Sequence, residues 1–148
     1  MGIGDVEMLN GWEPEELALR LRTLARVAAR GKRSAGNVAR FMVDVDCHCR
    51  QLAERLLRGE YRVGRGRTFW IEDPKPRLIF ALPFADRVVQ HLLIAETLPG
   101  LERRMAPQSF ACRRGKGTHR ALARASVLAL RHAWVLRVDV KNSAASLA

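Results

Sequence analysis

Residues 67–81 read Arg67-Thr68-Phe69-Trp70-Ile71-Glu72-Asp73-Pro74-Lys75-Pro76-Arg77-Leu78-Ile79-Phe80-Ala81 and predict a β-hairpin. Stretches 67–72 and 77–81 are rich in β-branched and aromatic residues, which favour strands. The intervening residues 73–76 include two prolines, which cannot donate the hydrogen bonds of a strand ladder. We therefore expect two antiparallel strands joined by a basic turn, with Pro83 ending the second strand.

Apolar residues recur at helical spacing on both sides of this hairpin. The helices that they predict cover residues 15–29, 38–57, 86–98 and 118–131. We expect Pro99-Gly100 to end the third helix and Thr118 to cap the fourth. The fourth helix should turn its small and apolar residues inward, namely Ala121, Leu122, Ala125 and Leu128.

Residues 135–140, Val-Leu-Arg-Val-Asp-Val, predict a final strand. Leu136 and Val138 would lie on one face, and Arg137 and Asp139 on the other. The element order of helices, hairpin, helices and strand predicts an α+β fold, with no linker that would divide it into independent domains.

The charge of the 148-residue chain is strongly positive and unevenly distributed. Its 26 Lys and Arg against 15 Asp and Glu give +11, of which residues 75–148 contribute +9. A basic surface attracts polyanions by releasing their counterions, so nucleic acid is the leading class of partner and an anionic membrane ranks lower. The 48% hydrophobic content argues against disorder of the whole chain.

Three cysteines, an odd and low number, argue against a disulfide framework and favour a reducing compartment. Cys47-His48-Cys49 is better explained by buried thiols on a helix than by a zinc site, whose ligands need looser spacing. No apolar run approaches the roughly 18 residues that span a bilayer, so we expect a soluble, cytoplasmic protein.

Two basic segments are candidates for phosphate contacts. Lys75 lies at the hairpin tip and Arg77 at the start of the second strand, where a point charge and a guanidinium fork could hold a triphosphate. Residues 109–119 read Ser-Phe-Ala-Cys-Arg-Arg-Gly-Lys-Gly-Thr-His, and their glycines allow close backbone approach to a nucleic-acid strand. The spacing is wrong for a P-loop, because Lys116 is followed by Gly117. A solvated basic turn and a flexible basic loop are the simpler alternatives.

These residues together resemble the reverse transcriptases of group II introns, retrons and diversity-generating retroelements. Members of that family have a Lys and an Arg on a fingers hairpin, then an apolar strand, a Pro, and Asp-Arg opening a helix. Here Arg77, Pro83 and Asp86-Arg87 follow in that order, and residues 109–119 resemble the next family block. Residues 136–141 resemble the first catalytic block.

The resemblance implies a fingers subdomain and the start of a right-hand polymerase palm, which is incomplete. It divides the chain into an N-terminal helical extension, 1–33, and a partial reverse transcriptase domain, 34–148. It assigns dNTP triphosphate contacts to Lys75 and Arg77. It assigns contacts with the template or other nucleic acid to a second group of residues, namely Arg87, Arg113, Arg114, Gly115, Lys116 and Gly117.

The same resemblance makes Asp139 the catalytic and metal-binding carboxylate of an RNA-directed DNA polymerase. Its partners would be an RNA template, a DNA primer and dNTPs, with two Mg²⁺ ions in the complete enzyme. Without the resemblance, a lone Asp at a strand end is more often a turn or cap residue.

The aromatic pair that follows this block in the family is replaced by Asn142-Ser143, and the later Tyr-x-Asp-Asp turn is missing. We therefore expect this chain alone to be inactive as a polymerase. The alternatives are a degenerate nucleic-acid-binding remnant without catalysis and a piece that associates with an accessory or complementing chain.

Overall fold

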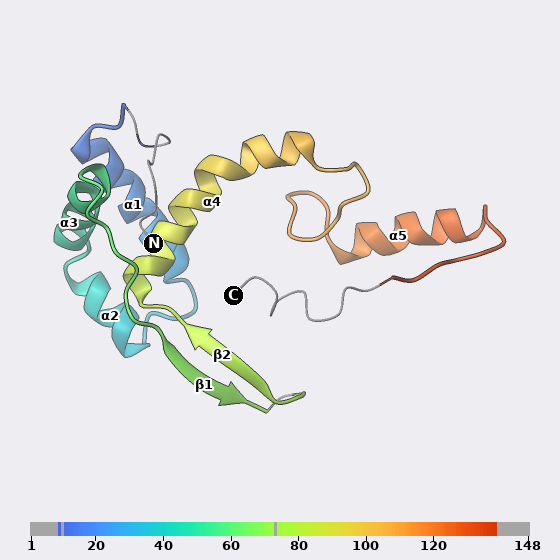
Figure 1. Ribbon diagram of the computed structural model, residues 1–148, viewed down its shortest axis with the longest axis horizontal. Coiled ribbons are helices and arrows are strands. Elements are labelled where there is room, and N and C mark those ends of the chain that lie inside the picture. The colour runs from blue at the N-terminus through green and yellow to red at the C-terminus, as the bar shows by residue number, and fades with distance from the viewer. Residues whose placement is uncertain (1–8, 10, 73, 139–148) are drawn as a thin grey trace. The chain divides into compact units, whose positions relative to one another are not determined.

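The computed structural model describes residue 9, residues 11–72 and residues 74–138. These residues form two compact units, Met1–Gly100 (unit 1) and Leu101–Ala148 (unit 2). Helices and one small antiparallel sheet make up the described chain, which confirms the α+β class at that level (Figure 1). No helix among the described residues is both long enough and apolar enough to cross a bilayer.

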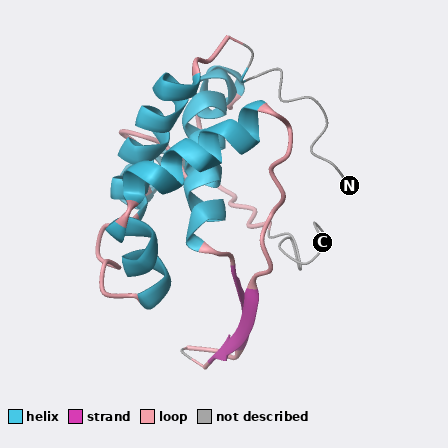
Figure 2. Cartoon of the chain, turned by 90° about the vertical axis from the view of Figure 1, so that its left-hand side faces the viewer, coloured by secondary structure: helices cyan, strands magenta, loops and turns pink. Residues whose placement is uncertain are grey.

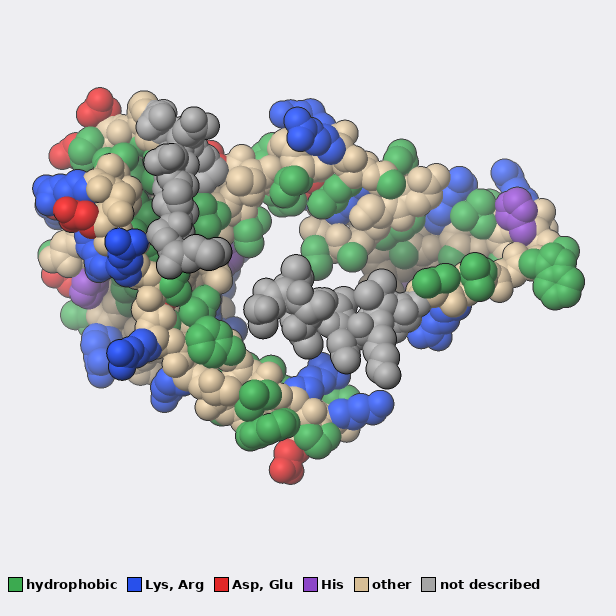
Figure 3. Space-filling model, in the orientation of Figure 1, with side chains coloured by type: hydrophobic (Ala, Val, Ile, Leu, Met, Phe, Trp, Pro, Cys, Tyr) green, Lys and Arg blue, Asp and Glu red, His purple; other side chains and the backbone are tan. Residues whose placement is uncertain are grey.

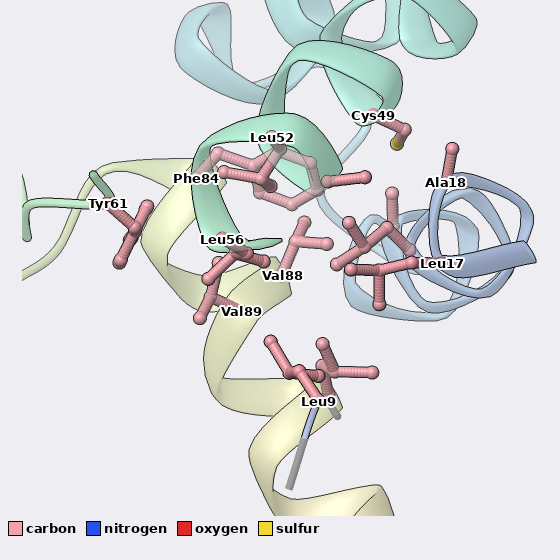
Figure 4. Close-up of a cluster of buried hydrophobic side chains, with 14 of the residues drawn as sticks. Leu9, Leu17, Ala18, Cys49, Leu52, Leu56, Tyr61, Phe84, Val88 and Val89 are labelled. Carbon is pink, nitrogen blue, oxygen red and sulfur yellow. The ribbon is translucent and has the colours of Figure 1, made fainter. Parts of the chain in front are cut away.

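The core of unit 1 is helical. Helix α1, Pro14–Ala28, packs on α3, Val45–Leu57, and the first turns of α4, Phe84–Arg104, complete the cluster. Figure 4 shows side chains from these helices pointing toward one another. The largest side chains that are fully buried include Leu17, Leu21, Val38, Val88 and Leu92. An ion pair of 3.0 Å between Arg20 and Glu96 also links α1 to α4.

The predicted helix 38–57 is wrong as a single element. It is divided into α2, Gly36–Val43, and α3 by Asp44, whose φ of −128° and ψ of 56° are not helical. The Asp44 side chain accepts a hydrogen bond of 3.3 Å from the Cys47 backbone N–H and so caps α3. An Asp in this position satisfies a backbone donor that a new helix leaves free.

Of the two thiols predicted to be buried on this helix, α3, Cys49 is buried and Cys47 is only half-buried. Burial, and then the negative charge of Asp46, raise the pKa of the Cys49 thiol from 9.0 to about 11. The thiol therefore stays protonated at neutral pH.

The predicted hairpin is confirmed. Strand β1, Arg67–Ile71, pairs antiparallel with β2, Arg77–Ala81, in a register that sets Phe69 opposite Ile79. The two strands project from the helices of unit 1 (Figures 1 and 2). Trp70 and Phe80 are 66% and 63% exposed, because two strands alone cannot cover their own faces.

Helix α4 does not end at Pro99-Gly100, as predicted, but continues to Arg104 with Pro99 inside it. Proline removes one hydrogen bond and bends a helix without obliging it to end, and the residues after Gly100 are good helix formers. Leu98 precedes the proline, and Leu101 accepts a hydrogen bond of 3.0 Å from the Met105 backbone N–H.

Unit 2 differs from the prediction at three points. Helix α5, Thr118–Ala129, is capped by Gly117 rather than by Thr118, and none of its residues is buried. Leu122, predicted to face inward, is 65% exposed because no described segment covers it. Residues 135–138 are not a strand, and among the described residues they have no ladder partner. Residues 139–140 lie outside the described part.

Candidate nucleic-acid interface

The turn of the hairpin presents its basic residues to solvent. Lys75 lies in the turn and Arg77 is the first residue of β2, opposite Ile71. Both side chains are exposed. Lys and Arg side chains appear at the hairpin tip in Figure 3. These cations are therefore accessible to an anionic ligand.

Asp86 and Arg87, adjacent in sequence, have different surroundings. Asp86 is buried, and its carboxylate accepts hydrogen bonds from the Tyr61 hydroxyl and, at 2.9 Å, from the Gly64 backbone N–H. Burial, and then the Asp86 hydrogen bond and charge, raise the pKa of Tyr61 well above its usual value of 10.0. Asp86 thus ties the chain before β1 to the first turn of α4, whereas Arg87 reaches a surface pocket.

Two glycines bring the chain before β1 against its neighbours. A Cβ added at Gly64 would lie 2.9 Å from the Pro83 ring and 3.1 Å from the Asp86 carboxylate. One at Gly66 would lie 2.4 Å from the Phe80 ring. Neither position can hold a side chain without movement of a neighbour, so both glycines serve close packing.

The residues next to these glycines line a basic pocket of about 570 Å³, which we call the arginine pocket. Four arginines line it: Arg40 from α2, Arg65 and Arg67 around the start of β1, and Arg87 from α4. The remaining lining residues are uncharged, namely Ala35, Gly36, Asn37, Ala81, Leu82 and Pro83. Lys and Arg side chains gather near α2 and the base of the hairpin in Figure 3.

Of these four arginines, the sequence prediction included only Arg87. Residues 62–67, Arg-Val-Gly-Arg-Gly-Arg, contained the signal for two others. In an extended chain, alternate residues face opposite sides, so glycines that pack on one side leave arginines on the other. Arg40 gave no such signal, since it lies on a helix far away in sequence.

The predicted template block is held together largely by its own side chains. The Arg113 guanidinium donates hydrogen bonds to three backbone carbonyls, those of Glu102, Ala106 and Ser109, at 3.0–3.2 Å. Lys116 donates to the Pro107 carbonyl and lies 5.3 Å from the centre of the Phe110 ring.

The glycines and Arg114 of this block have a different character. Gly115 and Gly117 have φ of 69° and 100°, which glycine adopts readily. Of the three cationic side chains in this block, those of Arg113 and Lys116 are half-buried and that of Arg114 is exposed.

The candidate residues fall into separate parts of the chain. Lys75, Arg77 and Arg87 belong to unit 1, and residues 113–117 belong to unit 2. Asp139 lies outside the described residues. Within the described ranges, no three His, Cys, Asp or Glu side chains gather so that they could hold a metal ion.

The chain matches no protein-family model, and no curated protein matches its sequence.

Proposed function

We propose that this chain is the fingers region, with the beginning of the palm, of a bacterial RNA-directed DNA polymerase. Its ligands would be an RNA template, a DNA primer and dNTPs. The observation that carries the proposal is the exposed basic turn of the hairpin, with Lys75 in the turn and Arg77 at the start of β2. A fingers hairpin that grips a triphosphate needs cations that are accessible and held on a regular element.

The surroundings of Asp86 and Arg87 support the same proposal. Asp86 is satisfied inside the protein by Tyr61 and Gly64, so it fixes the base of the hairpin. Arg87 opens onto a basic surface, as a nucleic-acid contact requires. In this proposal Asp86 has a structural role and Arg87 contacts nucleic acid, so the two adjacent residues have separate roles.

The charge of the chain supports a nucleic-acid partner. Residues 101–148 contain 10 basic and 2 acidic residues, a net charge of +8, and residues 1–100 contain 16 and 13, a net charge of +3. Among the template-block residues, Arg114 offers its side chain for phosphate contact, while Arg113 and Lys116 stabilise the loop from within.

Metal chemistry would depend on Asp139. In the complete enzyme, Mg²⁺ would neutralise the triphosphate and help to activate the primer hydroxyl, and Asp139 would supply one of the carboxylate ligands. Because one carboxylate cannot hold two such ions, we expect no primer extension by this chain alone. Extension in Mg²⁺ that is abolished by Asp139→Ala would contradict that expectation.

A photoreactive dNTP that carries its label on the γ-phosphate tests the triphosphate site. With the full chain and an RNA–DNA template–primer, we expect adducts within residues 67–81, competed by unlabelled dNTP. The double substitution Lys75→Gln/Arg77→Gln should reduce labelling tenfold or more, because the loss of even one charged hydrogen bond of roughly 1.5 kcal/mol corresponds to about tenfold.

The matched control is Arg26→Gln/Arg30→Gln, which removes the same charge from exposed positions outside the hairpin. Equal labelling of the two double variants would reject the triphosphate site. Labelling that spreads over the basic surface and is competed equally by any polyanion would instead favour the nucleic-acid-binding remnant.

A further inference from the structure

We infer that the arginine pocket binds the backbone phosphates of a single nucleic-acid strand. The inference rests on the proposed function in one respect, the identity of the polyanion as nucleic acid. The pocket is a different site from the hairpin turn, because neither Lys75 nor Arg77 lines it.

The pocket is lined by several elements, and packing and a hydrogen bond hold them in place. Its floor joins the start of α2, the end of β2 and the first turn of α4. Arg65 and Arg67 alternate with Gly64 and Gly66, which pack against Pro83 and Phe80. The hydrogen bond that the Gly64 backbone N–H donates to Asp86 then fixes the segment that leads into β1 and carries both arginines. The guanidinium groups are thus carried by ordered backbone on more than one element.

The balance of charge in the pocket distinguishes it from others in unit 1. Another pocket of unit 1 is lined by Arg22 and Arg50 together with Glu15 and Asp46, and Arg22 pairs with Asp46 at 2.9 Å. That pocket is neutral in sum. The arginine pocket contains four guanidinium groups and no carboxylate, so its field attracts anions.

The size and lining of the pocket indicate a backbone ligand. About 570 Å³ is more than one phosphate group needs and far less than a duplex needs. Guanidinium forks match phosphate oxygens, and no aromatic residue lines the pocket to stack on a base. Binding should therefore be insensitive to base identity.

Fluorescence anisotropy with the full chain tests the inference. The probes are 12-residue oligomers, namely U12, dT12 and an abasic strand of equal length. Arg65→Gln/Arg67→Gln should weaken binding of all three about tenfold or more, because charged hydrogen bonds to phosphate are lost. The slope of log K against log salt should fall by about 1.4, since each single-strand phosphate contact contributes about 0.7.

The matched control is Arg26→Gln/Arg50→Gln, which removes equal charge elsewhere in unit 1, including one arginine of the neutral pocket. A second variant, Arg65→Lys/Arg67→Lys, retains charge but removes the forks, and we expect intermediate affinity. Its thermal melt, compared with that of the wild type, separates lost contacts from lost folding.

The outcomes distinguish this inference from the proposed function. If wild-type protein binds the oligomers and the pocket and control variants are weakened equally, the pocket inference is overturned while the hairpin assignment stands. An affinity gain on 5′-phosphorylation that Arg65→Gln/Arg67→Gln abolishes would overturn it in favour of a terminal-phosphate site. Absence of binding by the wild type, with labelling of the hairpin by the dNTP probe unchanged, would overturn the pocket alone.

Discussion

Tyr61 and Asp86 form a buried pair that positions the arginine-bearing chain. Asp86 is a carboxylate in the protein interior with two donors, the Tyr61 hydroxyl and the Gly64 backbone N–H. Loss of a donor would leave a buried charge short of partners, which costs more than the bond itself contributes. The pair therefore links the first turn of α4 to the base of the hairpin.

The ionisation of Tyr61 gives the first prediction. Its pKa is raised in the folded protein, so its proton contributes stability below about pH 10 that is lost as pH rises beyond that value. Tyr61 is the single tyrosine of the chain, so tyrosinate absorbance reports on it alone. We expect its midpoint to lie well above the midpoint measured in urea. Coincident midpoints would exclude the buried hydrogen bond.

Gly64 and Gly66 should respond differently to substitution by alanine. At Gly64 the new methyl group meets the rigid Pro83 ring and the buried Asp86 carboxylate. At Gly66 it meets the ring of Phe80, which is 63% exposed and can swing away. We expect Gly64→Ala to lower the free energy of unfolding by about 1–3 kcal/mol, as overpacking does, and Gly66→Ala by less. Urea unfolding of both variants measures the difference, and a reversed order would contradict this account.

Local sequence patterns predicted some boundaries of the helices and strands and missed others. The hairpin was predicted to within one residue, because β-formers and prolines are local signals. The break at Asp44 was missed, since an apolar stripe continues across it and the cap is seen only in the Asp44–Cys47 hydrogen bond. The extension of α4 beyond Pro99 was missed because proline is a probable rather than an obligatory end of a helix.

The cap of α3 gives a prediction of its own. Asp44→Ala removes the acceptor for the Cys47 backbone N–H and should destabilise the protein by about 1 kcal/mol, the usual contribution of such a cap. Asp44→Asn is the matched control, because asparagine caps helices about as well as aspartate. Thermal melts of the two variants should differ by several degrees. Equal losses would mean that charge rather than capping is responsible.

The candidate site was predictable only where its residues are close together in sequence. Lys75 and Arg77 followed from a local motif, whereas the arginine pocket joins Arg40 to Arg87 across the fold. A prediction from one sequence cannot bring together residues that only tertiary packing makes neighbours. The proposed domain boundary at 33/34 remains a prediction, and α1 lies in the same compact unit as α3.

The two compact units should differ in stability. Unit 1 contains the buried cluster of α1, α3 and α4, whereas no residue of α5 in unit 2 is buried. Because local stability follows burial, amides of α5 should exchange with deuterium much faster than those of α1 and α3. Hydrogen exchange followed by mass spectrometry of the full chain would check this. Comparable protection of α5 and α3 would mean that a partner or second copy covers unit 2.

Four guanidinium groups around one pocket also repel each other when no anion is present. Any anion that occupies the pocket should therefore raise the melting temperature, and at equal ionic strength pyrophosphate should exceed sulfate, which should exceed chloride. Sulfate also stabilises proteins in general, so the informative quantity is the part of the effect lost in Arg67→Gln. The melting temperature of the purified protein would then depend on its buffer. In phosphate buffer, substitutions elsewhere in the protein would lower the melting temperature by less than they do in a buffer whose anion does not bind.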